Sequence, residues 1–471
     1  MEPVADSRGR MLKTVSTGDT VVLSAGEWRD VDLRIEAAGT EQRPVIVRAE
    51  TAGQTVFTGK SRLAVSGSHA TISGLRFHNI TSPHDVIVLR THSQRLAHHC
   101  RLTDCEISAA DPDADADSNT TDTDGSDKRP AVKSEQKWVE IYGTHNRVDH
   151  CRFEGKRSPG SLLVVWVADG DNHHRIDHNY FGPRPPLGRN GGEIIRIGTS
   201  DVSMNASQTI VEHNLFERCD GEAEIVSNKS CGNIYRDNTF RGCSGALTLR
   251  HGDDCRVERN FFLGERRRGT GGVRIIGRRH VVINNYFADL EGDDSRSAVS
   301  FMNGLKDSPL HGYVQVEGAV VCCNTFADCK VAMTIGVEAG ARQPLNPTRC
   351  AVGANLFVGR RNEIREVGQR EYWMEGADIR CRTAAEAGLF PDASGILRPA
   401  DRSVVTPAPA DSGTQLRAIV AATVADDIDG DSRATGISTG CDVPGDSPNP
   451  RHPLTTADVG PGRIAAKGTS E

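Results

Sequence analysis

Short apolar segments alternate with polar residues through the centre of the chain, and they recur at a nearly constant interval. The clearest marker is an asparagine followed two residues later by a phenylalanine, which begins at Asn179, Asn214, Asn238, Asn260, Asn285, Asn324 and Asn355. The copies at positions 214, 238, 260 and 285 lie 22 to 25 residues apart. Degenerate copies end at Phe77, Ile107 and Phe153. Repeats of this length, with short β-rich segments and many glycines, indicate a solenoid.

The apolar runs are too short for paired helices, and their side chains alternate with a period of two. We therefore predict an all-β fold, a single-stranded right-handed parallel β-helix, in which each turn of the chain is a rung that buries its inward side chains on the next. The repeat implies about ten rungs. The phenylalanines expected to stack inside are Phe181, Phe216, Phe240, Phe262 and Phe287.

Three regions follow from this pattern. Residues 1–45 are predicted to form an N-terminal cap, because a solenoid needs its open end covered. Residues 46–365 form the β-helix, interrupted near 111–127 by an acidic insertion that we expect to be a disordered loop. Residues 366–471 are expected to pack back on the solenoid as irregular chain. The acidic run Asp427–Asp431 is interpreted as a turn, since glycine falls at its fourth position and the EF-hand pattern fails.

Composition narrows the possible classes of protein. The 471 residues are 37% hydrophobic and 5% aromatic, which suits the thin core column of a solenoid. The net charge of −7 leaves no general basic surface for nucleic acid, so any polyanion site must be local. No run approaches the roughly 18 apolar residues of a membrane span, and Met1–Arg10 shows no signal peptide. We expect neither nucleic acid nor a membrane as partner, and localisation stays open.

The thirteen cysteines follow the same repeat. Cys219, Cys243 and Cys329 each lie 5 residues after the asparagine of their rung, and Cys231 and Cys255 lie 17 residues after theirs. We predict that Cys219 stacks on Cys243 and Cys231 on Cys255, packed as small hydrophobic side chains. Disulfide bonds are the alternative. The chain has no C-x-x-C pair, which argues against a zinc site.

The chemistry-bearing side chains occupy one window of the rung. Six of them fall between 8 and 15 positions after the asparagine of their own rung: Asn190, Glu222, Glu224, Lys229, Arg250 and Arg274. Where Leu247 and Leu249 point inward, alternation places Thr248 and Arg250 outside. Neighbouring rungs are about 4.8 Å apart. The sequence therefore predicts one charged patch on a single face of the solenoid.

Four motifs in this window carry a resemblance to a known family. They are Asn190-Gly191-Gly192-Glu193 with Arg196-Ile197-Gly198, then Glu222-Ala223-Glu224-Ile225, then Lys229, then Arg250-His251-Gly252-Asp253. The chain resembles polysaccharide lyase family six, the family of alginate lyases and chondroitinase B. Flanking segments such as Gly59-Lys60-Ser61 and His452-Pro453-Leu454-Thr455 resemble it too. Members usually act outside the cytoplasm, as secreted or periplasmic enzymes.

The resemblance implies a Ca²⁺ site. Its ligands would be Asn190, Glu222 and Glu224, and three oxygen ligands suit a hard cation. Glu193 is a possible fourth ligand, although strict alternation points it away from the others. The alternative is a surface carboxylate pair balanced by arginines.

The resemblance also implies a proton-transfer pair. Lys229 would be the base, because nearby positive charges disfavour the charged form of a lysine. Arg250 would be the acid, or equally an electrophilic stabiliser, since an arginine rarely releases its proton. His251 is a second acid candidate, but it shares the inward parity of Leu249, which favours a structural role.

Further arginines could hold an anionic polysaccharide. Arg274, Arg196 and Arg279 are candidate substrate-binding residues together with His251. For Arg196 and Arg279, solvated surface charge is an equally good interpretation. The oligomeric state is open.

The implied function is a polysaccharide lyase that cleaves a uronic-acid polymer by Ca²⁺-assisted β-elimination. Alginate is favoured because the Asn-Gly-Gly-Glu form resembles the alginate branch, and a dermatan sulfate lyase of the chondroitinase B type is the alternative. A β-helix glycoside hydrolase could use Asp220, Asp253 or Asp254 as its carboxylates. That hypothesis leaves Lys229 and Arg250 unexplained. A non-catalytic carbohydrate-binding solenoid would explain the fold but not the converging charges.

Overall fold

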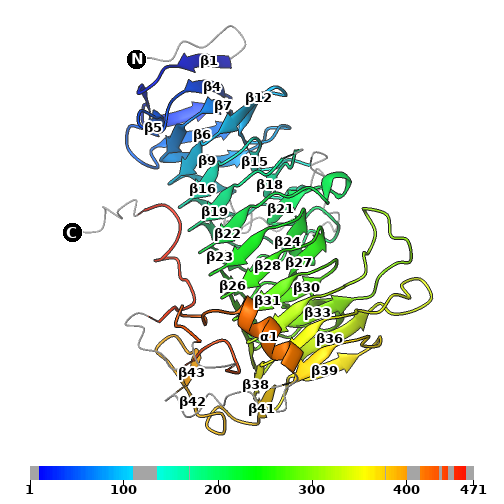
Figure 1. The fold of residues 1–471 in the computed structure, drawn as a ribbon. Helices are drawn as coiled ribbons and strands as arrows, with labels where there is room; N and C mark the ends of the chain where they lie inside the picture. Colours follow the sequence, from blue (N-terminus) through cyan, green and yellow to red (C-terminus); the bar gives the residue numbers. More distant parts are fainter. Residues whose placement is uncertain are drawn as a thin grey trace, which may run out of the picture.

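The computed structural model describes residues 10–109, 135–168, 170–376, 378–399, 414–433, 438–443 and 450–462. Nearly all of the regular structure is β-strand, and the strands stack along one long axis (Figure 1). Each turn of the chain contributes one strand to each of three parallel sheets. This is the parallel β-helix that the Asn-x-Phe repeat predicts.

The first sheet carries the site. Its main path is β1 (Arg10–Val15), β4 (Asp32–Ala38), β7 (Arg62–Ser68), β10 (Ile87–Val88), β15 (Val139–Ile141), β18 (Leu163–Val165), β21 (Ile195–Gly198), β24 (Glu224–Lys229), β27 (Ala246–His251), β30 (Val273–Ile275), β33 (Val299–Met302), β36 (Val331–Val337) and β39 (Glu363–Glu366). A hairpin of β11 (Arg90–His92) and β12 (Arg95–His98) joins it beside β7.

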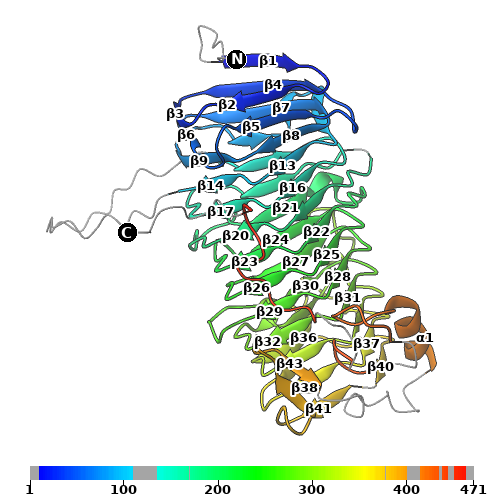
Figure 2. The ribbon, with the colours of Figure 1, turned by 90° about the vertical axis from the view of Figure 1, so that its left-hand side faces the viewer.

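The second and third sheets complete each rung (Figure 2). The second consists of β2 (Thr20–Leu23), β5 (Val45–Ala49), β8 (Ala70–Ser73), β13 (Arg101–Thr103), β16 (Arg147–Asp149), β19 (Arg175–Asp177), β22 (Ile210–Glu212), β25 (Ile234–Arg236), β28 (Arg256–Glu258), β31 (Val281–Ile283), β34 (Val320–Cys322), β37 (Ala351–Gly353) and β40 (Met374–Gly376). The third consists of β3 (Gly26–Arg29), β6 (Thr55–Gly59), β9 (Leu75–Ile80), β14 (Glu106–Ser108), β17 (Arg152–Glu154), β20 (Tyr180–Phe181), β23 (Leu215–Glu217), β26 (Thr239–Arg241), β29 (Phe261–Leu263), β32 (Tyr286–Ala288), β35 (Thr325–Ala327), β38 (Leu356–Val358) and β41 (Ile379–Cys381).

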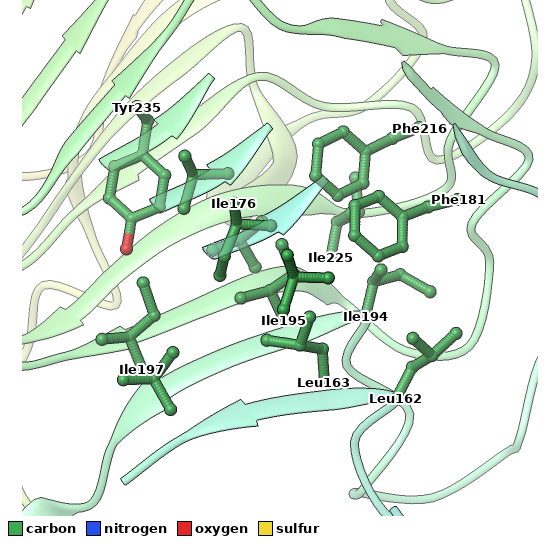
Figure 3. Packing of buried hydrophobic residues seen from close by; sticks show 14 of the residues in the cluster. Leu162, Leu163, Ile176, Phe181, Ile194, Ile195, Ile197, Phe216, Ile225 and Tyr235 are labelled. Atoms are coloured by element: carbon green, nitrogen blue, oxygen red, sulfur yellow. The ribbon is translucent and has the colours of Figure 1, made fainter. Parts of the chain in front are cut away.

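The phenylalanines of the repeat form a continuous column inside the solenoid, as predicted. From Phe181 through Phe216, Phe240 and Phe262 to Phe287, the centroids of successive rings are 4.5 to 4.9 Å apart and the rings are stacked. Aliphatic side chains from the first sheet pack against them (Figure 3). Stacked aromatic pairs add to the free energy gained by burying their area.

The asparagines of the repeat form a hydrogen-bonded ladder. The side-chain oxygen of Asn214 accepts from the backbone N–H and the side-chain amide of Asn179, both at 3.0 Å. Asn238 does the same for Asn214, and the pattern continues to Asn355. A buried backbone N–H needs an acceptor. The asparagine supplies one at the corner between the second and third sheets, where the strand ladders are interrupted.

The described part of the solenoid has more rungs than the ten that the repeat predicts, because each sheet has thirteen strands along its main path. Strands β1 to β4 lie within the predicted cap and pair in parallel with the strands that follow. Strands β40 and β41 lie beyond residue 365 and extend the second and third sheets. The acidic insertion at 111–127 lies outside the described residues.

The rest of the C-terminal region packs on the outside of the solenoid. It contains an antiparallel pair, β42 (Leu389–Pro391) and β43 (Leu397–Pro399), and one helix, α1 (Thr414–Thr423). Leu416 and Val420 of α1 cover Cys322 at the end of β34. Two 3₁₀ turns, η1 (Ser200–Val202) and η2 (Asp294–Arg296), lie on the solenoid itself. In the described part, no helix has the length and apolar character needed to cross a bilayer.

All thirteen cysteines are free thiols. Cys219 stacks on Cys243 as predicted, with the backbone N–H of Cys219 3.4 Å from the sulfur of Cys243. The predicted stacking of Cys231 on Cys255 is wrong. Ile234 pairs with Arg256, which sets Cys255 opposite Asn233. Cys231 lies two positions before Asn233, so it does not stack on Cys255. Counting from the asparagine failed here because the two rungs differ in length.

Candidate active site

The charged patch lies on the outer face of the first sheet, on β21, β24, β27 and β30. Pairing between these strands sets Arg196 opposite Ser227, Ser227 opposite Thr248, and Thr248 opposite Arg274. The residues between them, such as Ile195 and Ile197, point into the core (Figure 3). Alternation along buried strands therefore forces these polar residues into one outward row.

A cavity of about 480 Å³ opens on this face. Four residues expected from the sequence line it: Asn190, Glu222, Glu224 and Arg274. Others that the sequence did not single out for the site also line it, among them Arg189, Ser244, Arg296 and Tyr313. They come from connecting segments, which carry no periodic signal.

Glu222 faces the segment that contains Asn190. One carboxylate oxygen accepts hydrogen bonds from the backbone N–H groups of Gly191 at 2.8 Å and Gly192 at 3.2 Å. Burial, followed by the nearby carboxylates of Glu193 and Glu224, raises the pKa of Glu222 to about 7. The raised pKa thus reflects mainly the loss of solvation, to which the neighbouring carboxylates add.

Glu224 is the link between the cavity and the row of cations. One of its oxygens accepts from Arg274, whose side chain is almost fully buried, and lies 3.8 Å from the Nε of Arg250. Its other oxygen accepts from the hydroxyl of Ser227 at 2.5 Å. Glu224 thus fixes two guanidinium groups on adjacent rungs.

A register shift at the end of β27 brings three candidate residues together. Asn228 pairs with Leu249, but the next residue, Lys229, pairs with His251, so Arg250 is an extra residue in the strand. The prediction that His251 follows the inward parity of Leu249 is therefore wrong. The bulge moves His251 to the side of Lys229, and its Nδ1 lies 3.3 Å from Arg250.

His251 is uncharged at neutral pH. Burial, together with the positive charges of Arg250, Lys229 and His311, lowers its pKa to about 3. A neutral imidazole nitrogen can accept a hydrogen bond from the guanidinium of Arg250.

The segment between β33 and β34 contacts the side chain of Arg250 and fixes its position. The guanidinium donates to the carbonyl of Gly312 at 2.7 Å and to that of His311 at 3.3 Å, and it lies 4.3 Å from the ring centroid of Tyr313. This segment is the main part of the site that the sequence pattern missed.

A close backbone approach lies beside Lys229. Gly198, in the neighbouring rung, has φ of +81°, and a Cβ atom there would sit 2.3 Å from the carbonyl oxygen of Lys229. Only glycine fits without displacing that strand. The close approach of the two strands thus explains why the Arg196-Ile197-Gly198 motif ends in glycine.

The other candidates lie at varying distances from this centre. The carboxylate of Glu193 is buried and accepts from the hydroxyl of Ser161 at 3.0 Å, and it does not line the cavity. Arg196 lies over the ring of Trp166, 5.4 Å from its centroid. Arg279 lies outside the cavity, in the turn after β30, where it forms an ion pair with Asp254 at 2.6 Å.

The residues present fit a hard divalent cation. Amide and carboxylate oxygens of Asn190, Glu222 and Glu224 line the same cavity, and these are the ligand types that Ca²⁺ prefers. The hydrogen bonds from Gly191 and Gly192 hold the carboxylate of Glu222 next to Asn190, so these two ligand types lie side by side.

A second acidic group does not fit a metal ion as well. Glu212, His213 and Asp237 cluster on the second sheet, but Arg236 binds Glu212 at 2.6 Å and Arg259 binds Asp237 at 3.1 Å. Arginines pair with both of these carboxylates, whereas in the cavity they pair with Glu224, and Glu222 forms no ion pair within the described residues.

Comparison with known proteins now identifies the family. The family model for chondroitinase B matches residues 6–356. The structure is similar to that of the PL6 family alginate lyase AlyGC, with a TM-score of 0.73 and 33% identity over 84% of this chain. It is also similar to a mannuronic acid specific polysaccharide family 6 lyase from human gut microbiota, with a TM-score of 0.66 and 32% identity, covering 76% of this chain and 82% of that one.

The chain spans little more than half of AlyGC, 56% of its length. Among curated proteins, none matches this chain significantly. The family match nevertheless covers most of the chain, and it agrees with the motifs on β21, β24 and β27. The chain belongs to the chondroitinase B family, polysaccharide lyase family six.

Proposed function

We propose that the chain is a polysaccharide lyase that cleaves alginate by β-elimination at a uronate residue. Family membership supports the reaction class. The observation that carries the proposal is the convergence of Lys229 with Arg250 and His251 of the neighbouring rung, beside the carboxylates of a cavity. A surface that only binds carbohydrate needs no such convergence.

The reaction requires a base and a group that stabilises the leaving oxygen. Lys229 removes the proton from C5 of the uronate, the electrons of that bond form the C4–C5 double bond, and the C4–O glycosidic bond breaks. Arg250 donates hydrogen bonds to the departing oxygen, which takes up a proton from water, and Lys229 releases the C5 proton to solvent. Arg250 is suited to this because its guanidinium stays charged and is held in place.

His251 serves as a positioning residue in this scheme. Its pKa of about 3 leaves it without the proton that a general acid must give at neutral pH. It accepts from Arg250 instead, which orients the guanidinium together with the carbonyl of Gly312. This assigns proton removal to Lys229 and charge stabilisation to Arg250.

Ca²⁺ is the proposed cofactor. Asn190, Glu222 and Glu224 would hold it, and the bound ion would supply a Lewis acid for the carboxylate of the substrate. Glu193 is proposed as a ligand only through a change of rotamer, because its carboxylate is engaged by Ser161.

Arginines on the same face support an anionic polymer as substrate. Arg274 lines the cavity, and Arg196 lies one strand beyond the strand of Lys229, so uronate groups along a chain would meet both. Alginate is favoured because two solved structures with more than 30% identity are of an alginate lyase and a mannuronic acid specific lyase. The match to the chondroitinase B model makes dermatan sulfate the second candidate.

The test is a substrate panel assayed for the ultraviolet-absorbing unsaturated product of elimination. Alginate, its mannuronate-rich and guluronate-rich fractions, dermatan sulfate and polygalacturonate are incubated with the protein, with and without a chelator. We expect product from alginate, and a loss of it on chelation that added Ca²⁺ reverses.

Each other result points to a different class of protein. Reducing ends without ultraviolet absorbance would indicate a glycoside hydrolase, and binding without any product would indicate a carbohydrate-binding solenoid. Product from dermatan sulfate alone would replace alginate as the substrate while leaving the lyase proposal standing.

A further inference from the structure

Arg184 is a fully buried cation beneath the cavity. It follows β20, and only 1% of the residue is exposed. Its guanidinium donates to four backbone carbonyls: those of Glu193 at 2.7 Å, Gly160 at 2.9 Å, Ser158 at 3.1 Å and Gly191 at 3.2 Å. Within the described residues it forms no ion pair. An unpaired buried guanidinium is costly, so its position needs a reason.

Two of the carbonyls bound by Arg184, those of Gly191 and Glu193, belong to the segment that contains Asn190. The amides of this segment point the other way, because Gly191 and Gly192 donate to Glu222. The segment 190–193 is therefore gripped on two sides, by Arg184 through its carbonyls and by Glu222 through its N–H groups. A shift of Arg184 would move Asn190 and Glu222 relative to each other.

The segment 190–193 and the segment of Gly221 approach each other so closely that no side chain fits between their backbones. A Cβ atom on Gly192 would sit 2.3 Å from the carbonyl oxygen of Gly221, and one on Gly221 would sit 3.0 Å from the Cδ of Arg184. Glycine at both positions lets the backbones pass each other directly over the guanidinium.

Arg184 also supplies the fixed positive charge of this region. A guanidinium keeps its proton at neutral pH, so Arg184 stays charged although it is buried. The neighbouring buried amine of Lys156 has its pKa lowered to about 6, by burial and then by Arg184. Lys156, as a largely neutral amine, donates to the carbonyls of Ser158 and Pro159. It therefore stabilises the loop 158–160, which Arg184 also binds.

Arg274 shows what a carboxylate-binding arginine does in this site, because its guanidinium occupies an oxygen of Glu224. Arg184 differs. It acts on Glu193 and Glu222 through space, without contacting their carboxylate oxygens.

We propose that Arg184 is a positioning residue of the cation site: it holds the segment 190–193 through backbone carbonyls, and it offsets the charge of Glu222 without contacting the carboxylate that would bind a divalent cation. This inference rests on the Ca²⁺ part of the proposed function. It does not depend on which polysaccharide is cleaved.

The test is Arg184→Lys, which keeps a positive charge but loses the planar fork that reaches four carbonyls. Isothermal titration of Ca²⁺ into the intact protein measures the affinity directly. We expect binding weaker by about 10- to 100-fold, the usual effect of losing a residue that orients metal ligands. Thermal unfolding should show that the variant needs correspondingly more Ca²⁺ for the same stabilisation.

Arg259→Lys is the matched control. Arg259 is also a buried arginine of the solenoid, but it binds the carboxylates of Asp237 and Glu258 on the second sheet. This variant should lose thermal stability and keep the Ca²⁺ affinity of the wild type. At saturating Ca²⁺, the turnover of Arg184→Lys should return towards that of the wild type, which a general folding defect would not allow.

Two results would overturn the inference. One is a folded Arg184→Lys protein that binds Ca²⁺ as tightly as the wild type, and the other is a wild-type protein that binds no Ca²⁺ at all. Should Arg184→Lys fail to fold, a wild-type crystal structure with Ca²⁺ decides the matter. It must show the ion beside Asn190 and Glu222 with the guanidinium still on Gly191 and Glu193. None of these results removes the lyase proposal, which depends on product formation by the wild type.

Discussion

In the parallel pairing of β24 with β27, Lys229 lies opposite His251, and Arg250 is the extra residue that precedes His251. This bulge places an amine on one rung beside a guanidinium and a neutral imidazole on the next, all on the outer face of the first sheet. Bulges re-aim side chains next to active sites. The arrangement makes the roles of the three residues separable by mutation.

Lys229→Ala should remove elimination activity while the fold remains intact. Lys229 is a partly exposed residue at the end of β24, so its loss removes the proposed base and no core contact. General-base catalysis contributes roughly 10²- to 10⁴-fold, and we expect turnover to fall by that much. Initial rates of ultraviolet-absorbing product measure the effect.

The control for this prediction is Lys330→Ala, which breaks only the ion pair with Asp293 at 2.6 Å. It should keep wild-type turnover and change the free energy of unfolding by at most about 0.5 kcal/mol. Wild-type turnover in Lys229→Ala would show that another group removes the proton.

Arg250→Lys should lower turnover by roughly 10²-fold or more. A lysine keeps the charge, but its ammonium cannot donate to Gly312 and to the leaving oxygen in the geometry of a fork. The value of kcat should fall more than KM rises, because the interaction forms in the transition state. Arg349→Lys, at an exposed ion pair with Glu317, is the control and should behave as wild type.

The stability of the protein should fall in acid because of His174. Burial lowers its pKa to about 3, from the usual histidine value of about 6.5. The unfolded chain then binds a proton that the folded chain excludes, so the stabilisation is present above pH 6.5 and is lost as the pH falls towards 3. Between pH 7 and pH 5 this single group costs roughly 2 kcal/mol.

His174→Asn isolates this effect. The Nδ1 of His174 accepts from the backbone N–H of Asn146 at 3.0 Å, and Asn146 in turn supplies a side-chain oxygen to Cys100 in the same way. An asparagine can therefore keep the acceptor and remove the titration. We expect a smaller loss of melting temperature between pH 7 and pH 5 than in the wild type, and an unchanged loss would assign the acid sensitivity to other groups.

Phe240→Ala should destabilise the fold by about 3 to 5 kcal/mol, because it leaves a cavity in the middle of the aromatic column. Its ring stacks on Phe216 at 4.5 Å and on Phe262 at 4.7 Å between centroids. Phe390→Ala, at a phenylalanine that is 57% exposed, is the control and should change stability little. Chemical denaturation of both variants measures the difference, and equal small effects would contradict a continuous column.

The sequence by itself determined the repeating part of the molecule. In the rungs around Phe216, Phe240 and Phe262, the same side chain returns at each turn. One pattern therefore predicts the core phenylalanines, the corner asparagines and the outward-facing positions. The outward positions of Arg250 and Arg274 follow from two-residue alternation beside inward leucines and valines. Glu224 likewise lies at the start of β24, and Glu222 precedes that strand by two residues, on the same side of the cavity.

Only the tertiary structure decided the parts that depend on neighbouring rungs of unequal length. The bulge at Arg250 arises in the pairing of two strands, so counting along either strand alone misplaces His251. Cys255 shifted away from Cys231 for the same reason. The contacts of Tyr313 and Arg184 come from connecting segments, whose paths are set by hydrogen bonds to other rungs and leave no periodic trace in the sequence. Local alternation is a property of the strand, whereas register is a property of the pair.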